Sequence, residues 1–298
     1  MDAVIDVGSN TIRMLLGDYQ NGRLLSPRYC RNITRLSGDF SEQNGLSEAG
    51  MCRSLTALKS YKKIISAQQV SQIRVVGTAA LRRARNRQTF IDVVYSETGL
   101  TIEVIDGAEE ALMSTRGALS VISPIPRAAI VIDIGGGSTE LACVIDGYIH
   151  FQKSYPLGVV RLCEEYSSET DRQQQIDATC KQFAESLAGL DKFDYQLIGT
   201  AGTITTLAAI HLQLEKYDAD MINNHEISFS WLKRLQQKLE LLSVQEREAV
   251  AGMEQGRGDL ILPGLQILLA LLSLLKLSTL RVSDSGLLEG VMLNLTDS

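Results

Sequence analysis

The sequence has few aromatic residues and no recognisable pattern of cysteines or histidines. Aromatic residues make up 5% of its 298 residues and hydrophobic residues 45%, so we expect mainly aliphatic cores. Its five cysteines are odd in number, scattered and nowhere spaced as CxxC, which argues against a disulfide framework or zinc site and favours the reduced thiols of a cytoplasmic protein. His150, His211 and His225 are too few and too separated in sequence to form a ligand set, and no nucleophile motif accompanies them.

Signals for membranes or export are also missing. The longest apolar run, residues 260–275, is shorter than the roughly 20 residues of a membrane-spanning helix and contains Pro263. We therefore expect a buried core helix there and no membrane partner, although exposed apolar surface on 260–276 would equally support a homodimer. The first residues include Asp2 and Asp6 but no basic segment, so we expect no signal peptide.

The net charge of -6 is divided unevenly along the chain. Residues 1–123 hold 15 Lys and Arg against 12 Asp and Glu, whereas residues 124–298 hold 14 against 23. Residues 71–90 contain five arginines and no acid. Such a run is usually a solvated helix face, but a polyanion could also dock on it. We do not expect a nucleic-acid partner.

The order of expected elements indicates two domains. In the first part we expect strands at 2–7, 11–18, 23–34, 73–76 and 101–105, with helices from 47, over 79–95 and from 109. Residues 123–126, Ser-Pro-Ile-Pro, then break the pattern. In the second part we expect strands at 128–133, 139–146, 149–155, 196–198 and 280–282, with helices at 171–188, from 203, at 229–242, at 254–276 and from 287. The repeated βββαβα order predicts two related α/β domains, 1–123 and 124–298, facing one another across a cleft. The last helix, 286–298, is a candidate to pack back on the first domain.

Three glycine-rich turns follow apolar runs. They are Asp6-Val7-Gly8-Ser9-Asn10-Thr11, Asp133-Ile134-Gly135-Gly136-Gly137-Ser138-Thr139 and Gly199-Thr200-Ala201-Gly202-Thr203. Such turns expose backbone N–H groups that can wrap a phosphate, and the third opens a helix whose N-terminus favours anions. The second lacks the Lys of a P-loop and precedes a strand, unlike the glycines of a dinucleotide fold. The first two turns each have an Asp at the end of the leading strand, so together they predict a site for phosphate and a divalent cation.

Eight ordered motifs over nearly the whole chain resemble those of one family. They are Asp6 to Thr11 with Arg13, Gly77 to Arg82 with Asn86, Gly107 to Ala111, Asp133 to Leu141, Pro156 to Leu162, Gly199 to Thr203, Arg257 to Asp259 with Pro263-Gly264, and Ser283 to Gly290. The chain resembles the exopolyphosphatase and guanosine pentaphosphate phosphohydrolase (Ppx/GppA) family of the actin-like ATPase superfamily. The resemblance implies an α/β fold of two duplicated ribonuclease-H-like domains with an interdomain cleft. Two departures are Asp106, where the family usually has Ser, and the lack of the C-terminal helical module of longer relatives.

The resemblance also implies roles for individual residues. Glu110 is the expected acceptor that orients the attacking water, and Arg82 can pair bidentately with a phosphoryl oxygen. The expected phosphate-binding residues are Gly8, Ser9, Asn10, Arg13, Gly135, Gly136, Gly137, Ser138, Gly202 and Thr203. Asp133 and Glu140, assisted by Asp6, are the expected ligands of Mg²⁺ or Mn²⁺. Structural roles compete with these: the paired glutamates suit the first turn of a helix, and each Asp can stabilise its own turn.

These residues point to an enzyme that cleaves phosphoanhydride bonds. We expect Mg²⁺-assisted release of terminal phosphate from inorganic polyphosphate, with guanosine pentaphosphate as the second candidate substrate. A phosphotransferase related to the small-molecule kinases of the superfamily remains an alternative. A further alternative is a sensor that binds an alarmone or nucleotide without turning it over.

Overall fold

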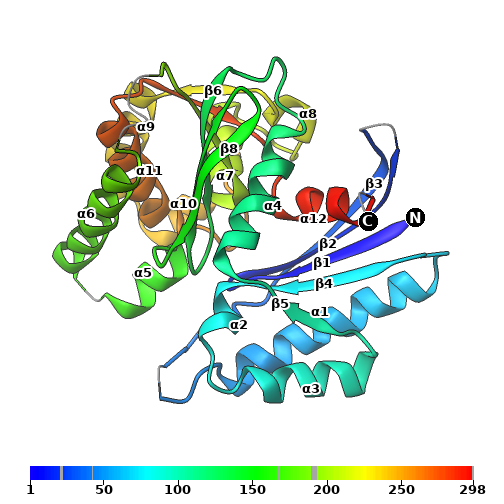
Figure 1. Cartoon of the computed structure of the whole chain (residues 1–298). Helices are drawn as coiled ribbons and strands as arrows, with labels where there is room; N and C mark the ends of the chain where they lie inside the picture. Colours follow the sequence, from blue (N-terminus) through cyan, green and yellow to red (C-terminus); the bar gives the residue numbers. More distant parts are fainter. Residues whose placement is uncertain (21–22, 42, 167, 189–192, 297–298) are drawn as a thin grey trace. The chain divides into compact units, whose positions relative to one another are not determined.

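The computed structural model describes the chain except for residues 21–22, 42, 167, 189–192 and 297–298 (Figure 1). The chain forms two compact units, Met1–Gly117 with Leu287–Ser298 and Ala118–Gly286. The change of unit lies before the expected position at 123/124, because Ala118 and Ile122 pack with Val131 and Val144 of the second unit. The C-terminal helix belongs to the first unit.

The first unit is built on a five-stranded sheet in the order β3-β2-β1-β4-β5. The strands are β1 (Asp2–Val7), β2 (Thr11–Gln20), β3 (Arg23–Ile33), β4 (Ile73–Gly77) and β5 (Ile102–Val104). β2 is antiparallel to β1 and β3, whereas β4 is parallel to β1 and β5. Parallel neighbours need crossover helices, and the chain supplies them between β1, β4 and β5.

Helices cover both faces of this sheet (Figure 1). α1 (Glu48–Ser66) and α3 (Arg87–Thr98) pack on the face that includes Ile5, whereas α4 (Gly107–Leu119) and α12 (Leu287–Thr296) pack on the face that includes Val4. Successive residues of a strand point to opposite faces of the sheet. The apolar run Ala3-Val4-Ile5 of β1 is therefore buried on both faces. The expected start of α1 is confirmed: the side chain of Ser47 accepts a hydrogen bond from the N–H of Gly50.

The expected helical region 79–95 is confirmed except at residues 84–86, where the chain leaves the helical conformation. α2 (Ala79–Arg83) ends at Ala84, which is extended, and α3 begins at Arg87. The side chain of Asn86 forms a pair of hydrogen bonds, both 2.9 Å, with the backbone N–H and carbonyl of Leu46. This tertiary contact holds the break between the two helices.

The second unit repeats the order of the first. Its strands are β6 (Ala128–Ile134), β7 (Thr139–Ile145), β8 (Tyr148–Tyr155), β9 (Gln196–Thr200), β10 (Glu226–Ser228) and β11 (Thr279–Val282). They form a sheet in the order β10-β11-β9-β6-β7-β8. Read from the other edge, β8-β7-β6-β9-β11 matches β3-β2-β1-β4-β5 of the first unit in strand order and direction. The expected α/β duplication is confirmed, and β10 is an addition that the sequence did not predict.

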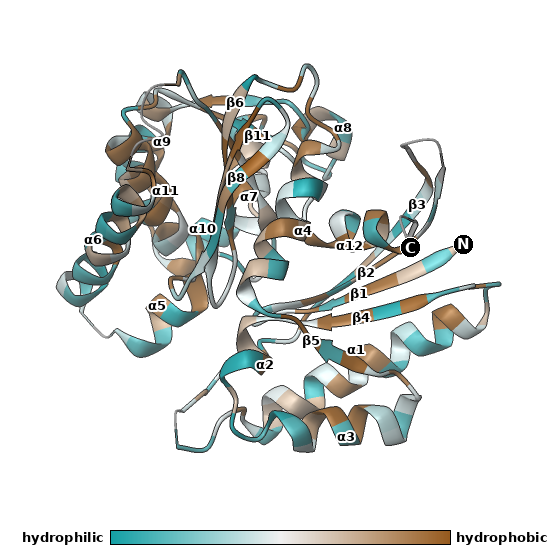
Figure 2. Cartoon of the chain, viewed as in Figure 1, coloured by the Kyte–Doolittle hydropathy of each residue, from teal (hydrophilic) through white to brown (hydrophobic). Residues whose placement is uncertain are grey.

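Helices of the second unit differ from expectation in four places. They are α5 (Val159–Glu165), α6 (Glu169–Ser186), α7 (Ala201–His211), α8 (Ala219–Ile222), α9 (Phe229–Glu240), α10 (Val244–Glu248) and α11 (Ile261–Leu275). α5, α8 and α10 are short and were not predicted, and α11 starts at 261, not 254. α11 is apolar along its length (Figure 2), and nine of its residues are buried in the core of this unit. Burial within the unit therefore accounts for the apolar run. No helix among the described residues is long and apolar enough to cross a membrane.

Candidate functional site

The first glycine turn links β1 to β2 and is fixed by backbone hydrogen bonds. The N–H of Gly8 donates to the carbonyl of Thr11 at 3.1 Å, and the carbonyl of Asn10 accepts from Thr34 and Arg35 at 3.0 and 2.9 Å. A Cβ on Gly8 would lie 2.8 Å from the Thr11 carbonyl oxygen. Because that neighbour is backbone, the turn requires glycine at this position.

Two polar atoms in this turn are buried without a partner. Asp6 and Asn10 are 4% and 5% exposed, and the Oδ1 atom of each has no hydrogen-bond partner among the described residues. The other carboxylate oxygen of Asp6 accepts from Arg13, at 2.7 Å from Nη2 and 3.2 Å from Nε. Buried oxygens that lack donors are costly unless a ligand satisfies them. Arg13, expected to bind phosphate, thus also serves as the ion-pair partner of Asp6.

The two expected catalytic residues lie together in the first unit. Arg82 is in α2, which follows β4, and Glu110 is in the first turn of α4. The Nη1 atom of Arg82 donates to Oε2 of Glu110 and, at 3.3 Å, to the carbonyl of Ile105. The Glu110 side chain is 10% exposed and that of Arg82 is 22% exposed. A largely buried carboxylate is thus held beside a guanidinium whose Nε and Nη2 groups have no partner among the described residues.

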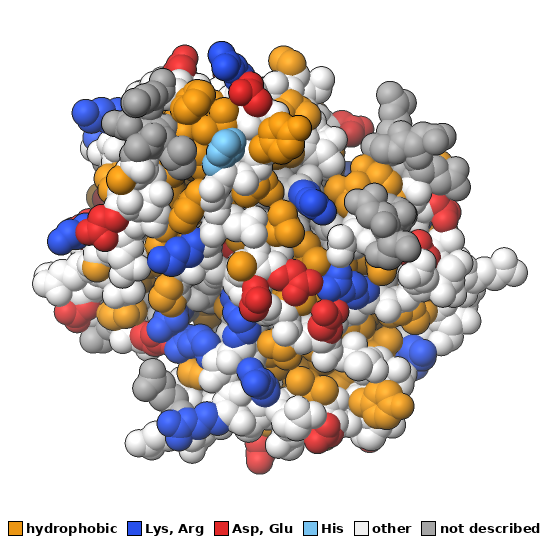
Figure 3. All heavy atoms as spheres, in the orientation of Figure 1, with side chains coloured by type: hydrophobic (Ala, Val, Ile, Leu, Met, Phe, Trp, Pro, Cys, Tyr) orange, Lys and Arg blue, Asp and Glu red, His pale blue; other side chains and the backbone are white. Residues whose placement is uncertain are grey.

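The paired glutamates have different partners, which separates their roles. Glu109 forms an ion pair with Arg74 at 2.8 Å, and Arg74 also contacts Glu103 at 2.9 Å. Hydrogen bonds to Glu103 and Glu109 raise the pKa of the Arg74 guanidinium. Arg74 is therefore neutralised and does not extend the basic surface around α2, where Lys and Arg side chains gather (Figure 3). Glu109 fits the structural role of a first-turn acid, whereas the catalytic role of Glu110 stays a prediction.

Asp106 caps the helix that carries both glutamates. Its Oδ1 atom accepts hydrogen bonds of 2.8 Å from the backbone N–H groups of Ala108 and Glu109. The helix begins at Gly107, two residues before the expected start, because this cap satisfies its first N–H groups. The unusual carboxylate at this position therefore supports the orientation of Glu110.

The second glycine turn joins β6 to β7. The N–H of Gly135 donates to the carbonyl of Ser138 at 3.0 Å, and the carbonyl of Gly136 accepts from Val160 and Arg161 at the start of α5. A Cβ on Gly158 would lie 2.4 Å from the Gly136 carbonyl oxygen, so this glycine allows α5 to approach the turn. The turn is thus packed against a helix that sequence reasoning missed.

The expected metal ligands of the second unit are cross-strand partners. Asp133 of β6 faces Glu140 of β7 in the antiparallel register, which places both side chains on the same face of the sheet. Asp133 is 9% exposed and Glu140 4%, and Oε1 of Glu140 accepts from Ser154 Oγ at 2.6 Å. Among the described residues, no three His, Cys, Asp or Glu side chains gather as a metal-binding group. Two buried carboxylates fit Mg²⁺, which commonly takes one or two carboxylates and completes its shell with water and substrate phosphates.

The third turn ends β9 and begins α7. Ala201 has a φ of +70°, in the left-handed region that favours glycine. Thr203 is 2% exposed, and its Cγ2 atom would lie 2.4 Å from a Cβ on Gly264 in α11. Its side chain is thus packed against another helix, which argues for a structural role, and the expected phosphate contact of Gly202 and Thr203 stays a prediction.

Arg257 lies against this turn and was not among the expected site residues. A Cβ on Gly202 would lie 1.7 Å from its Nη2 atom, so the absence of a side chain makes room for the guanidinium. Arg257 is 8% exposed and pairs with Glu254 through Nε. The motif Arg257-Gly258-Asp259 marked Arg257 in the sequence, but nothing in the sequence indicates that Arg257 lies against Gly202.

Two of the three histidines, His211 and His225, are in contact, although their separation in the sequence gave no sign of it. His211 Nδ1 lies 2.6 Å from His225 Nε2, and the ring of His211 meets Trp231 edge-on with centroids 4.4 Å apart. Burial lowers the pKa of both histidines, and for His225 the neighbouring His211 adds to the effect. Among the described residues, none of the five cysteines forms a disulfide.

Comparison with known proteins identifies the family. The model of the Ppx/GppA phosphatase family matches residues 28–298. Exopolyphosphatase 2 of Mycobacterium tuberculosis is 30% identical, with 98% of each chain covered. A guanosine-5'-triphosphate,3'-diphosphate pyrophosphatase of Aliivibrio fischeri is 29% identical over the whole of this chain, which spans only 59% of that relative.

Solved structures agree with these relatives. An exopolyphosphatase from Cytophaga hutchinsonii superimposes with a TM-score of 0.86 at 30% identity, covering 99% of this chain and 97% of that one. The Ppx/GppA enzyme of Aquifex aeolicus gives a TM-score of 0.80 at 29% identity, with 98% of each chain covered. The actin-like ATPase fold expected from the sequence is thereby confirmed. The chain belongs to the Ppx/GppA phosphatase family.

Proposed function

We propose that the protein releases terminal phosphate from inorganic polyphosphate by hydrolysing a phosphoanhydride bond. The observation that carries the proposal is the Arg82–Glu110 pair, a largely buried carboxylate held beside a guanidinium with unused donors. The M. tuberculosis relative named exopolyphosphatase supports polyphosphate as the substrate, because the similarity covers 98% of both chains.

Glu110 would orient the attacking water and accept its proton. An ionised carboxylate only accepts hydrogen bonds, so a water held by Glu110 directs its lone pair away from the carboxylate and toward phosphorus. Arg82 would bind the terminal phosphoryl group through Nε and Nη2 while Nη1 holds Glu110 in place. One arginine would thus fix both the electrophile and the group that activates its nucleophile.

Each glycine turn would bind phosphate in its own unit. Backbone N–H groups of Ser9 and Asn10 would supply donors in the first unit, and those of residues 136–138 would supply donors in the second. The N–H groups of Gly8 and Gly135 instead close the turns.

Asp133 and Glu140 would hold Mg²⁺ in the second unit. Asp6, whose buried Oδ1 has no hydrogen-bond partner among the described residues, is a separate candidate ligand in the first unit. A divalent cation bound there would neutralise charge on the phosphate oxygens of the substrate. The donors are all oxygens of hard carboxylates, which suits Mg²⁺ or Mn²⁺ and disfavours softer metals. We place the protein in the cytoplasm, because five cysteines that form no disulfide among the described residues suit a reducing compartment.

The test is the release of inorganic phosphate from long-chain polyphosphate by the purified chain. We expect release with Mg²⁺ or Mn²⁺, none after chelation with EDTA, and recovery when Mg²⁺ is restored. Formation of ATP when ADP is added, with little free phosphate, would favour the phosphotransferase alternative. A thermal shift with guanosine pentaphosphate but no phosphate release from either substrate would favour a sensor.

Guanosine pentaphosphate is the second candidate substrate. The relative from A. fischeri supports it by name, at 29% identity over the whole of this chain. The two candidates need the same chemistry at the terminal phosphoryl group and differ only in what lies beyond it. Comparison of kcat/KM for the two substrates ranks them directly.

A further inference from the structure

One carboxylate in the second unit holds the backbone on both sides of Arg257. Glu248 is the last residue of α10, and its Oε2 atom accepts a hydrogen bond of 2.9 Å from the N–H of Gly256. Its Oε1 atom accepts a second, of 2.7 Å, from the N–H of Gly258. Backbone N–H groups that donate to a carboxylate form stronger hydrogen bonds than they do with neutral acceptors. The segment 256–258 is therefore clamped to α10 by a single side chain.

The glycines beside Arg257 explain what this clamp adds. Glycine leaves the backbone more conformational freedom than any other residue, and Arg257 has one on each side. Gly256 has a φ of +79°, in the left-handed region that favours glycine. A Cβ on Gly258 would lie 2.9 Å from Oε1 of Glu248 and 2.7 Å from the carbonyl oxygen of Val244. The glycines thus let the segment approach α10, and the carboxylate removes the freedom that they introduce.

The helix that carries Glu248 is itself anchored. Ser243 and Glu246 form a capping box at the N-terminus of α10. Near its other end, Arg247 donates through Nε to the carbonyl of Leu239 at 2.9 Å and through Nη1 to the carbonyl of Gly258 at 3.4 Å. The carboxylate therefore projects from a fixed support.

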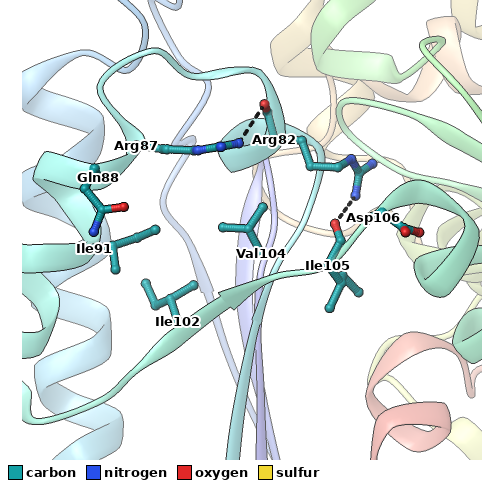
Figure 4. A pocket seen from close by; sticks show the side chains of 8 residues that line it. All are labelled: Arg82, Arg87, Gln88, Ile91, Ile102, Val104, Ile105 and Asp106. Atoms are coloured by element: carbon teal, nitrogen blue, oxygen red, sulfur yellow. Dashed lines mark hydrogen bonds between the residues drawn. The ribbon is translucent and has the colours of Figure 1, made fainter.

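The clamped segment presents a guanidinium to an expected phosphate-binding turn. Arg257 lies against Gly202 in the third glycine turn, and its side chain is 10% exposed. In the first unit, Arg82 is held through its own guanidinium, which donates to the carbonyl of Ile105 at 3.3 Å (Figure 4). Arg257 is held through its guanidinium, by Glu254, and also through the backbone on either side. The position of Arg257 thus depends on Glu248.

We propose that Glu248 is a positioning residue, which fixes Arg257 so that its guanidinium binds a phosphate group of the substrate at the third glycine turn. The inference rests on the proposed function. An arginine that is ordered before its ligand arrives loses less conformational freedom on binding, so the clamp raises affinity without touching the substrate. The negative charge of Glu248 acts in the opposite direction, because it repels an anion. Removal of the carboxylate therefore raises KM if Glu248 positions Arg257, and lowers KM if only its charge matters.

The first test is Glu248→Gln, which removes the charge and one of the two acceptors. We expect the KM for polyphosphate to rise about tenfold while kcat stays within twofold, because the proposed catalytic pair is unchanged. Glu246→Gln is the matched control, since it removes the same charge from the same helix and weakens its capping box but leaves the contacts to 256–258. Its KM should stay within twofold of wild type. Glu248→Asp keeps the charge on a side chain one methylene shorter and should give an intermediate KM, which retains the test if Glu248→Gln does not fold.

The second test asks whether Glu248 acts through Arg257. We expect Arg257→Gln to raise KM at least as much as Glu248→Gln, and the double variant to match Arg257→Gln within twofold. Effects that multiply in the double variant, an unchanged or lowered KM in Glu248→Gln, or an equal rise in Glu246→Gln would each overturn the inference.

Binding of tripolyphosphate, measured by calorimetry, tests the same positions without turnover. We expect Kd to rise in Glu248→Gln, Arg257→Gln and the double variant in the same order as KM, and to stay within twofold in Glu246→Gln. Absence of binding by wild type, or equal Kd values in wild type and Glu248→Gln, would overturn the inference. If wild type binds tripolyphosphate in this order of affinities but releases no phosphate from polyphosphate, the proposed function fails and the positioning role stands.

Discussion

Replacement of Glu110 by Gln removes a charge from the proposed site while keeping the shape of the side chain. A positioned general base contributes roughly 10²–10⁴-fold to a rate, or about 3–5 kcal/mol of transition-state stabilisation. We therefore expect kcat for polyphosphate to fall by about 10²–10⁴-fold. KM should change little, because the proposed phosphate-binding groups remain.

The effect of the same change on stability should be small. Breaking a fully buried ion pair costs about 3–5 kcal/mol. Arg82 is 22% exposed, retains its hydrogen bond to the Ile105 carbonyl and can still donate to the Gln amide oxygen. We expect the free energy of unfolding to fall by only about 1 kcal/mol, in the range of partly exposed pairs. The predicted loss of transition-state stabilisation thus exceeds the predicted loss of folding stability by about 2–4 kcal/mol.

Glu109→Gln is the matched control, one residue earlier on the same helix. Arg74 keeps its second partner, Glu103, so stability and kcat should each change little. Both variants are assayed by release of inorganic phosphate under saturating polyphosphate and by urea unfolding followed by circular dichroism. If Glu110→Gln keeps more than a third of the wild-type kcat, or if Glu109→Gln loses as much as Glu110→Gln, the assigned roles are refuted.

Three further outcomes follow from packing and charge. Gly202→Ala changes an expected phosphate-binding position and places a methyl group where the Arg257 guanidinium lies, so we expect a raised KM for polyphosphate and an almost unchanged melting temperature; an unchanged KM would remove Gly202 from phosphate binding. Burial lowers the pKa of His211 and His225 below the ordinary 6.5, so the unfolded chain binds more protons at acid pH. The free energy of unfolding should therefore decline as the pH falls through 6.5, and His225→Gln should flatten that decline in urea titrations between pH 5 and 8; an equal slope in the variant would contradict this. Phe183→Ala empties a fully buried position and should cost about 3–5 kcal/mol in the same assay, and a cost below 1 kcal/mol would show that the core closes around the gap.

Features that depend on neighbouring residues were predictable. The turn at Gly8 closes through a hydrogen bond to Thr11, three residues away, and the N-cap at Ser47 acts on Gly50. Such interactions join residues close in sequence and can be predicted from the local sequence. The same holds for the pattern of apolar residues that marks a buried strand. The repeated strand order followed from the same local signals, applied twice.

Features that depend on distant residues were missed or misjudged. The break at 84–86 is held by Asn86 bonding to Leu46, forty residues earlier, and helical periodicity continues through it. The contact between His211 and His225 needs the packing of α7 beside the chain that leads to β10. Propensity is a weak prior, and tertiary contacts override it where they supply a partner.

The sequence by itself determined the duplicated α/β order, the three glycine turns and the candidate residues Glu110 and Arg82, because each is expressed in local patterns or in motifs of fixed spacing. Only the tertiary structure decided which partner each charged residue takes. Glu109 and Glu110 are adjacent and chemically alike, yet one pairs with Arg74 and the other with Arg82. Their positions on α4 differ by about 100° around the helix axis, so packing against the sheet turns them toward different arginines. The sequence does not show which arginine each glutamate meets. The rotation between them separates Glu109, a structural acid, from Glu110, the proposed catalytic acid.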